Sequence, residues 1–484
     1  MLKRSSPSVY SAIAMSFKLL HLTSLGLCLL FVNYSVNCAP VSCGKNRTFS
    51  SSAKTISLRN IFALTLFLED EKQEKHSIYL SINPKNQLVE LTWFDVNLNE
   101  TIEPVVLITN GPVKNVSMEV TGRWIIDDGV DLLFELSLNS SEGKQLTELK
   151  HSFWVNRRME LDTGCYKFWF HLVSNKNVVN SGCLKTNSFW MHEMQTKIEN
   201  KKIRNLFLPG THDSASFKRG LDPIMSENIV TRFTVTQDDD IMSQLVHGIR
   251  YLDLRVGYYR SNQDKFWANH GISRMNPLAE VLSQVKEFID GTNEIVLLDF
   301  QEFPVGFQGK TDVHKQLVFF LFEQLAEYAA DPELTWDATL KDIWRSGRRV
   351  IIAYDHFGVV QSESLGILWQ SARQRWGKVN SGSERLLNFL RESRSNSSRE
   401  FQTSRPFAEM AELTPEVSNI FATNSQSLRQ MADSVNFDIT KLYTRDFGNG
   451  ANIVAVDFYQ STNIVNAAIA WNTRKFSGAS DCRN

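Results

Sequence analysis

The sequence carries almost no net charge, with 52 Lys and Arg residues against 53 Asp and Glu in 484 residues. A protein that holds nucleic acid through its phosphates normally has a clear excess of basic residues. The charge balance therefore argues against a nucleic-acid partner. Hydrophobic residues make up 42% of the chain and charged residues 22%, which is ordinary for a globular protein and unlike a disordered one.

Several catalytic signatures are also missing. The sequence has no Walker loop, no HExxH zinc motif, no CxxC pair and no GxSxG nucleophile elbow. P-loop nucleotide chemistry, zinc-protease chemistry, thiol redox chemistry and α/β-hydrolase chemistry are therefore not indicated. The sequence also shows no cluster of residues at metal-ligand spacing, and we expect no metal and no other cofactor.

Long apolar runs are confined to the amino terminus. Three basic residues precede a 14-residue apolar stretch, Leu19 to Val32, and a pattern of small residues then offers cleavage before Ala39. The stretch is short for a membrane span. We predict a signal peptide over residues 1–38 and a secreted, extracellular protein with no transmembrane anchor after its removal. An uncleaved signal anchor is the alternative.

Cysteine is scarce, with six residues in the chain, two of them inside the predicted signal peptide. An even number of remaining cysteines in a secreted protein favours disulfides. Cys165 and Cys183 bracket a predicted hairpin, so we pair them, and a Cys43–Cys482 bridge follows by elimination. The chain also has Asn-x-Ser/Thr sequons that suggest a glycosylated surface, at Asn46, Asn99, Asn115, Asn139 and Asn396.

Residues 39–190 show the pattern of a β-rich domain. Ser77–Ile82 and Val116–Val120 alternate or nearly alternate apolar and polar residues, and clusters of Asn, Gly, Pro and Asp separate such segments. Several short strands between turns favour a small all-β sandwich. Nothing here suggests catalysis, so we interpret this domain as structural or adhesive.

Residues 191–484 alternate strands with helices, which favours an α/β fold built as a distorted TIM-type (β/α) barrel. The best helix has an apolar stripe from Leu278 to Ile289, with Asn276 as its N-cap and Gly291 as its stop. Residues 379–405 are rich in Ser, Arg and Asn and predict an exposed loop. The expected strands are Ile203–Leu208, Ile249–Arg255, Ile295–Phe300, Val350–Tyr354 and Ile453–Phe458.

Polar residues suited to acid–base chemistry follow three of these segments. Catalytic residues of α/β barrels lie at the carboxyl ends of the strands, and His212, Arg255 and Asp457 fall at such ends. Asp213 follows His212, and His270 lies in Ala-Asn-His-Gly. Two histidines can serve as base and acid near neutral pH, and carboxylates can fix their tautomers.

The arginine suits the charge of a phosphate. Its guanidinium can donate two parallel hydrogen bonds to phosphate oxygens and stays charged. Asp253 lies two residues before Arg255, so both side chains face the same way on a strand, and Asp253 can orient Arg255. Each residue also has a structural interpretation, as a buried histidine, a helix cap or an ion-pair partner. Their shared position at strand ends favours phosphodiester cleavage.

Three segments resemble a known family. Leu206-Phe207-Leu208-Pro209-Gly210-Thr211-His212-Asp213-Ser214, then Gly248 to Arg255, then His270-Gly271, look like the X domain of phosphatidylinositol-specific phospholipase C. The likeness covers about residues 190–475. The β-rich part, with its Cys165–Cys183 hairpin, is more loosely similar to the extension of secreted arthropod-type members.

The resemblance implies a reaction and a role for each residue. The inositol 2-hydroxyl would attack its own phosphate, giving cyclic inositol phosphate and diacylglycerol. His212 would be the general base and His270 the general acid. Asp213 would support His270, Arg255 would stabilise the transition state, and Asp457 would orient His212.

The same resemblance bears on the metal. Animal signalling phospholipases C hold calcium through an Asn after the first His and through acids on the next strands. Here those positions include Asp213 and Arg255. Because a guanidinium repels a cation and can replace its electrostatic effect, we expect a metal-independent enzyme that acts on a phospholipid headgroup at a membrane surface.

The resemblance does not extend to the residues that hold the headgroup. Bacterial members have a Lys after strand four and an Arg after strand five to hold inositol, and the corresponding stretches here have neither. Asp253 and Tyr354 are the candidate substrate-binding residues, Tyr354 by stacking on a sugar ring. The lipid could be phosphatidylinositol or a glycosyl-phosphatidylinositol anchor.

Two other hypotheses remain open. One is a metal-dependent glycerophosphodiesterase or sphingomyelinase D-like enzyme, which would need paired acids for Mg²⁺ and would be inhibited by EDTA. The other is a catalytically inactive lipid- or glycan-binding protein that uses the β-rich domain. In that case His212→Ala would leave the biological activity intact.

Overall fold

The structure is a computed structural model that describes residues 77–99, 101, 103–151, 161–400, 405–416 and 425–477, without the side chains of 395–400 and 477. All of the described residues belong to one compact unit. The predicted signal peptide and several predicted modification residues lie outside the described residues: Cys43, Cys482, Asn46 and the side chain of Asn396.

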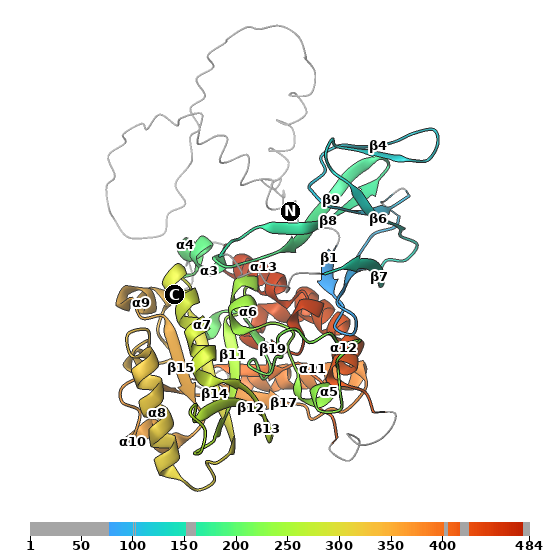
Figure 1. The fold of residues 1–484 in the computed structure, drawn as a ribbon. Helices are drawn as coiled ribbons and strands as arrows, with labels where there is room; N and C mark the ends of the chain where they lie inside the picture. The colour runs from blue at the N-terminus through green and yellow to red at the C-terminus, as the bar shows by residue number, and fades with distance from the viewer. Residues whose placement is uncertain are drawn as a thin grey trace, which may run out of the picture. The chain divides into compact units, whose positions relative to one another are not determined.

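Two antiparallel sheets form the first part of the described chain (Figure 1). The three-stranded sheet has the order β1 (Ser77–Ile82), β2 (Leu88–Phe94) and β7 (Gly143–Lys150). The four-stranded sheet has the order β6 (Leu132–Ser137), β3 (Val105–Thr109), β8 (Cys165–Ser174) and β9 (Asn177–Lys185). A separate hairpin pairs β4 (Val116–Met118) with β5 (Trp124–Ile126).

A shared apolar core holds these two sheets together. Leu91 of β2, Ile108 of β3 and Leu172 of β8 belong to one cluster and are fully buried. Alternate residues of each strand point into this core, as the alternation in the sequence predicts. The predicted β-sandwich is confirmed, and so is the Cys165–Cys183 disulfide, whose Cα atoms are 5.6 Å apart.

A largely parallel sheet forms the second part. Its order is β16 (Leu368–Gln370), β15 (Val350–Tyr354), β14 (Val296–Val305), β11 (Tyr251–Tyr258), β10 (Leu208–Thr211), β19 (Ile453–Val456), β18 (Phe407–Met410) and β17 (Arg373–Trp376). Only Ser371 and Ala372 separate β16 from β17, which brings the two ends of the sheet together. The predicted distorted barrel is confirmed. An antiparallel hairpin, β12 (Phe266–His270) and β13 (Ser273–Pro277), extends from β11.

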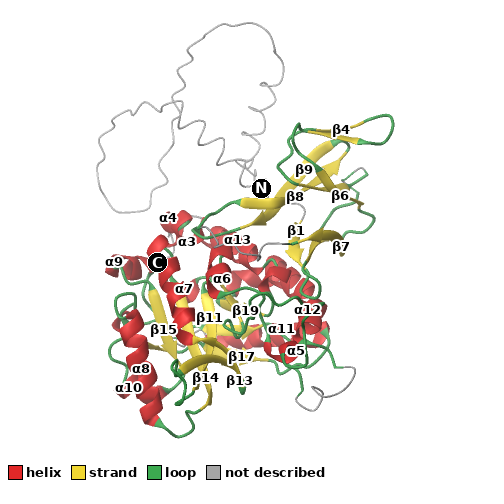
Figure 2. Cartoon of the chain, in the orientation of Figure 1, coloured by secondary structure: helices red, strands yellow, loops and turns green. Residues whose placement is uncertain are grey.

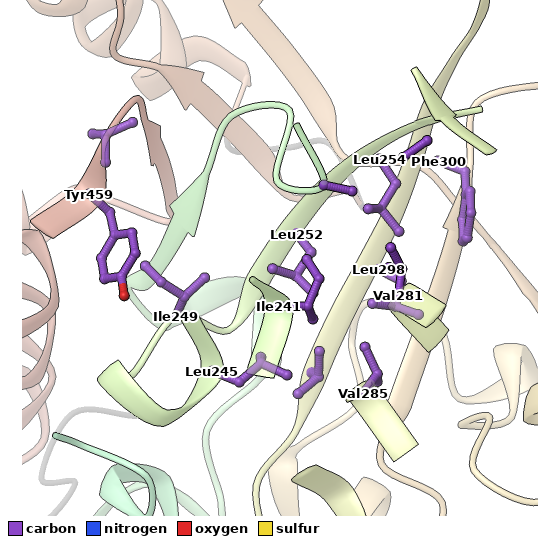
Figure 3. Close-up of a cluster of buried hydrophobic side chains, with 14 of the residues drawn as sticks. Ile241, Leu245, Ile249, Leu252, Leu254, Val281, Val285, Leu298, Phe300 and Tyr459 are labelled. Atoms are coloured by element: carbon purple, nitrogen blue, oxygen red, sulfur yellow. The ribbon is translucent and has the colours of Figure 1, made fainter. Parts of the chain in front are cut away.

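Helices pack on the outside of this sheet (Figure 2). Figure 3 shows the contact between β11 and β14 and the two helices α6 and α7, where Leu252, Leu254 and Leu298 meet Leu245 and Val281. The helices are α3 (Trp190–Glu193), α4 (Gln195–Ile198), α5 (Thr231–Thr234), α6 (Ile241–His247), α7 (Leu278–Gly291), α8 (Thr311–Leu325), α9 (Leu340–Ser346), α10 (Phe357–Ser362), α11 (Ser383–Glu400), α12 (Leu428–Leu442) and α13 (Ile464–Ser477).

The predicted strand Ile203–Leu208 is wrong in its first part. Ile203–Asn205 is a 3₁₀ turn, and β10 begins only at Leu208. The reason is that side chains satisfy the preceding backbone. Asn472 hydrogen-bonds both the N–H and the carbonyl of Phe207, and Asn452 donates to the carbonyl of Leu206.

Two further predictions need correction. Asn276 does not cap α7, because the helix begins one residue later, with Pro277 at the N-cap position. The Asn276 amide donates to the carbonyls of Ala215 and Phe217, both at 2.9 Å. Much of the loop predicted over residues 379–405 is helix α11. Leu386 and Leu390 are fully buried and four residues apart. They form a narrow apolar stripe on an otherwise polar helix, which the composition of the segment does not indicate.

No helix among the described residues has both the length and the apolar content needed to cross a bilayer. Three of the predicted glycosylation residues are exposed, namely Asn99, Asn115 and Asn139.

Candidate active site

The register of the parallel sheet brings the predicted residues together. Thr211 of β10 pairs with Leu252 of β11 and with Val456 of β19. The next residue of each segment is polar: His212, Asp253 and Asp457. All three therefore stand at one level, at the carboxyl end of the sheet. Leu252 and Leu254 pack outward against helices, which turns Asp253 and Arg255 toward the barrel interior.

His212 lies at the centre of this group. Its Nδ1 is 2.7 Å from Oδ1 of Asp457, and its Nε2 is 2.7 Å from a guanidinium nitrogen of Arg255. Arginine can only donate, so Nε2 accepts and the imidazole proton sits on Nδ1. Burial and the positive charge of Arg255 lower the pKa of His212 to about 3. The ring is therefore a neutral imidazole whose Nε2 lone pair accepts from Arg255.

Arg255 connects the carboxylates of the site. Its guanidinium lies 3.4 Å from Asp253, 3.7 Å from Asp213 and 3.7 Å from Glu302. Burial opposes its charge, but Asp213 and Asp253 more than compensate and raise its pKa. The Nε atom is buried without a hydrogen-bond partner in the structure. A fixed cation with an unused donor suits an anionic ligand.

His270 stands on the other side of this group, with its ring centroid 6.3 Å from that of His212 and the two rings nearly perpendicular. Its Nδ1 lies 3.0 Å from the carbonyl of Thr234, which can only accept. The proton of neutral His270 therefore sits on Nδ1. The expected partner Asp213 is 3.8 Å away, too far for a hydrogen bond, so the backbone carbonyl orients this ring.

Asp213 has an unusual backbone conformation. Its φ is +40°, in the left-handed region that non-glycine residues rarely adopt. Asp253 accepts a hydrogen bond from its N–H at 2.9 Å, and Thr236 donates to its carbonyl at 2.9 Å. One oxygen of its carboxylate is buried without a hydrogen-bond partner. Strain held in place by neighbours, beside an unsatisfied carboxylate, is typical of functional sites.

The two predicted substrate-binding residues have other roles. Asp253 is fully buried, and its oxygens accept from the backbone N–H of Asp213, the guanidinium of Arg255 and the amide of Gln374, so it positions the site. Tyr354 is 1% exposed, and its hydroxyl lies 2.7 Å from Nδ1 of His314 in the hydrophobic core. A buried ring cannot stack on a sugar from solvent, so the prediction for Tyr354 is wrong.

Glu412 is a site residue that the sequence did not reveal. It follows β18 and lies beside Asp457, because Met410 pairs with Ala455. His212, Glu412 and Asp457 place ligand atoms within 4.8 Å of one another, close enough for a metal ion. Burial and the neighbouring Asp457 raise the pKa of Glu412 to about 8. Both ring nitrogens of His212 already have partners, so a cation here would have to displace Asp457 or Arg255.

Trp376 and Gln374 were missed as well. Trp376 lies 5.2 Å from the His212 ring and 5.2 Å from the Arg255 guanidinium, and Gln374 donates to Asp253 at 2.9 Å. Both come from β17, whose polar sequence Arg-Gln-Arg-Trp shows no strand pattern. A tryptophan in a polar stretch is the one signal that could have indicated them.

Comparison with known proteins gives sequence relatives for part of the chain. No family model matches the chain. It is 26% identical over 265 residues to PI-PLC X domain-containing protein 1 of Danio rerio, which covers 50% of this chain and 81% of that protein. It is 24% identical over 321 residues to the Homo sapiens protein of the same name, covering 60% and 94%.

Further likenesses include an enzyme and two solved structures. The Trypanosoma brucei brucei variant-surface-glycoprotein phospholipase C is 28% identical over 188 residues, covering 34% of this chain and 51% of that protein. The phosphatidylinositol-specific phospholipases C of Staphylococcus aureus and Listeria monocytogenes superimpose with TM-scores of 0.45 and 0.43, at 16% and 18% identity. They cover 59% and 58% of this chain, and 97% and 98% of those chains.

Proposed function

We propose that this chain, which belongs to the family of PI-PLC X domain-containing proteins, is a phosphodiesterase that cleaves phosphatidylinositol or glycosyl-phosphatidylinositol lipids. The observation that carries the proposal is the pair of histidines in one site, each with Nδ1 held by an acceptor. Proton transfer with a substrate therefore falls to the two Nε2 atoms, and that of His212 accepts from Arg255 in the structure.

The proposed reaction is an internal attack. His212 Nε2 takes the proton of the inositol 2-hydroxyl as its oxygen bonds to phosphorus, and Asp457 stabilises the imidazolium that forms. The bond from phosphorus to the glycerol oxygen breaks, and protonated His270 gives that oxygen a proton. The products are cyclic inositol phosphate and diacylglycerol. Because nucleophile and phosphate belong to one molecule, proximity supplies much of the rate.

Arg255 supports this scheme as the electrostatic partner of the phosphate. It now donates to the lone pair of His212, and a phosphate oxygen, being negatively charged, is the better acceptor. Substrate binding would draw the guanidinium to the phosphate and free the base. The cation is then in place as negative charge builds on the non-bridging oxygens.

We also propose that the reaction needs no metal, with Arg255 in the electrostatic role. The metal-dependent alternative is favoured by one observation, the proximity of His212, Glu412 and Asp457. The two readings differ in their response to a chelator. Activity that persists in EDTA supports the arginine, and activity that EDTA abolishes and Mg²⁺ or Ca²⁺ restores supports the metal.

Secretion is part of the proposal. The Cys165–Cys183 disulfide suits an oxidising compartment, and the exposed sequon residues Asn99, Asn115 and Asn139 are accessible to glycosylation. Expression in a secreting animal cell, followed by treatment of the medium with an N-glycosidase, would test it. Retention of the protein in the cytosol would contradict it.

The deciding experiment incubates purified protein with phosphatidylinositol in EDTA and follows cyclic inositol phosphate by phosphorus NMR. We expect turnover by the unaltered protein and a loss of ~10²–10⁴ in rate for His212→Ala and for His270→Ala. Near-normal turnover by either variant would contradict the assigned roles. No turnover by the unaltered protein on either lipid would favour a binding protein.

A further inference from the structure

A tyrosine of the β-sandwich reaches the barrel at the end of helix α6. Tyr166 is the second residue of β8, next to the disulfide-bonded Cys165, and this end of β8 lies against α6 (Figure 1). The Tyr166 hydroxyl is 2.9 Å from Nε2 of His247, the last residue of α6. Burial lowers the pKa of His247 to about 4, so its ring is neutral at pH 7. Nδ1 of this ring is 2.8 Å from the carbonyl of Ser243, which can only accept. The ring proton is therefore on Nδ1, and Tyr166 donates to Nε2.

The contact continues through buried side chains into the barrel. The centroid of the His247 ring lies 5.9 Å from that of Tyr459, in the 3₁₀ turn Tyr459–Ser461 that follows β19. Tyr459 and Gln460 both donate to the same oxygen, Oδ2, of Asp239. His247, Tyr459 and Asp239 are all buried. Because protein interiors are closely packed, a displacement of His247 must also displace the side chains beyond it.

Tyr459 belongs to the first of two segments that orient the catalytic histidines. It lies two residues after Asp457, whose carboxylate holds Nδ1 of His212 at 2.7 Å. Phe458 stands between them with a φ of +46°, in the left-handed region that a bulky residue rarely adopts. Such a conformation persists only where the surrounding structure holds it. The hydrogen bond from Tyr459 to Asp239 holds this segment on the side away from His212.

The second segment leads from the same contact to the other histidine. It begins at Thr234, whose carbonyl holds Nδ1 of His270 at 3.0 Å, and ends at Asp239. In its middle, the amide of Gln237 donates to the carbonyl of His212 at 3.1 Å and accepts from the backbone of the first segment at 3.3 Å. The buried contact beside the β-sandwich therefore adjoins both segments that orient the catalytic rings.

We propose that Tyr166 is a positioning residue of the active site, which acts through His247 on the two segments that orient His212 and His270. The β-sandwich then contributes to cleavage by holding the catalytic rings, without touching the substrate. A tyrosine hydroxyl suits this role, because it fixes His247 by one directional hydrogen bond that phenylalanine cannot make. The proposal rests on the proposed function for its kinetic test, whereas a measurement on the His212 ring needs no turnover.

The test variant is Tyr166→Phe in the full chain, which removes the hydroxyl and keeps the ring. We expect kcat on phosphatidylinositol to fall ~10-fold and KM to stay within about twofold, because a small misplacement of catalytic groups slows the chemical step. NMR of histidine-labelled protein gives the second measurement, the signal of the Nδ1 proton of His212. We expect this signal to shift and its exchange with water to become faster, since Asp457 is held less firmly.

Tyr79→Phe is the matched control. Tyr79 is a buried tyrosine of β1 in the same sandwich, but its hydroxyl bonds Thr440 of α12 rather than the two segments. This variant should leave kcat and the His212 signal unchanged, even where it lowers stability. His247→Gln, which keeps an acceptor near the Nε2 position, should retain more activity than His247→Leu. Tyr166→Phe added to His247→Leu should have no further effect, because both changes remove the same hydrogen bond.

The outcomes separate this proposal from the proposed function. Circular dichroism checks that each variant is folded. An unchanged kcat and an unchanged His212 signal in Tyr166→Phe would overturn the proposal. So would equal losses in Tyr166→Phe and Tyr79→Phe, or additive effects of Tyr166→Phe and His247→Leu, because these results indicate general destabilisation. If the unaltered protein has no turnover, the proposed function fails, and the His212 signal alone decides whether Tyr166 positions the ring.

Discussion

At the scale of single residues, the site depends on which nitrogen of each histidine carries its proton. Asp457 and the Thr234 carbonyl both accept from Nδ1, so the lone pair of each ring lies on Nε2, which in His212 accepts from Arg255. The sequence alone cannot show this, because Asp457 is 245 residues away from His212. The acceptors nevertheless decide which nitrogen of each ring can exchange a proton with the substrate.

Asp457→Asn tests the tautomer directly. The asparagine amide can donate to Nδ1 of His212, which would move the ring proton to Nε2 and remove the base. We expect the cleavage rate to fall by ~10²–10⁴ with little change in stability. Initial rates on phosphatidylinositol give the measurement. Asp355→Asn is the matched control, since Asp355 follows β15 and bonds Ser371 rather than a site histidine. A rate within threefold of the unaltered protein would exclude the orienting role.

Arg255 should set the ionisation of His212. Burial and the guanidinium hold the pKa of His212 to about 3, below the ordinary value of about 6.5. Removing the charge in Arg255→Gln should therefore raise that pKa, so that His212 is more protonated at pH 5 in the variant. Arg255→Lys keeps the charge and should shift the pKa less, although it loses the two-pronged contact with phosphate. NMR titration of the His212 ring measures both, and identical pKa values in the Gln variant and the unaltered protein would exclude the effect.

At the scale of elements, sequence patterns predicted the segments that follow simple rules. β15 matches its predicted range, and β11, β14 and β19 lie within a few residues of theirs, because buried parallel strands are continuous apolar runs. His212 and Arg255 could be predicted as site residues because they lie at the ends of those apolar runs. The hairpin β12–β13 and the strands β16 to β18 could not be predicted, since they are short, and β13 and β17 are largely polar. Such segments become strands only through pairing with neighbours.

The site residues that the sequence did not reveal have the same explanation. Trp376 belongs to β17 and Glu412 follows β18, and neither strand shows a clear pattern in the sequence. Asp213 was expected to bind His270, but the bond comes from a backbone carbonyl in α5, which no side-chain pattern encodes. Tyr354 was wrongly assigned because a tyrosine at a strand end can face either the pocket or the core.

Gly210→Ala tests how closely β10 must approach β11. A Cβ atom at residue 210 would lie 2.7 Å from Cδ1 and 3.1 Å from Cβ of buried Tyr251, so the strands must separate. We expect a loss of ~1–3 kcal/mol in unfolding free energy and a marked loss of cleavage, because His212 follows two residues later. Urea unfolding and initial rates measure the two effects. Gly358→Ala on α10, where the nearest atom is 3.5 Å away, is the control, and equal stability of the two variants would contradict the packing argument.

At the scale of the whole molecule, one carboxylate joins the β-sandwich to the barrel. Asp433 of α12 accepts from Asn83 at 2.9 Å and pairs with Lys85 at 2.7 Å and Lys144 at 3.2 Å. Its side chain is 15% exposed. Arg429, one turn earlier on α12, donates to Pro84 of the same hairpin at 2.9 Å. These bonds tie the β-sandwich to helix α12 of the barrel.

Asp433→Ala should therefore separate the unfolding of the two parts. Burial opposes the charge of Asp433, but Lys85 and Lys144 lower its pKa, so its stabilising effect is present above the unfolded-state pKa and is lost as the pH falls through the folded-state value. We expect a loss of ~1–3 kcal/mol at pH 7, a calorimetric transition that broadens or splits, and a smaller difference from the unaltered protein at low pH. Glu323→Ala, on the exposed side of α8, should change neither. A single transition of unchanged midpoint in Asp433→Ala would mean that the apolar contacts alone join the sandwich to the barrel.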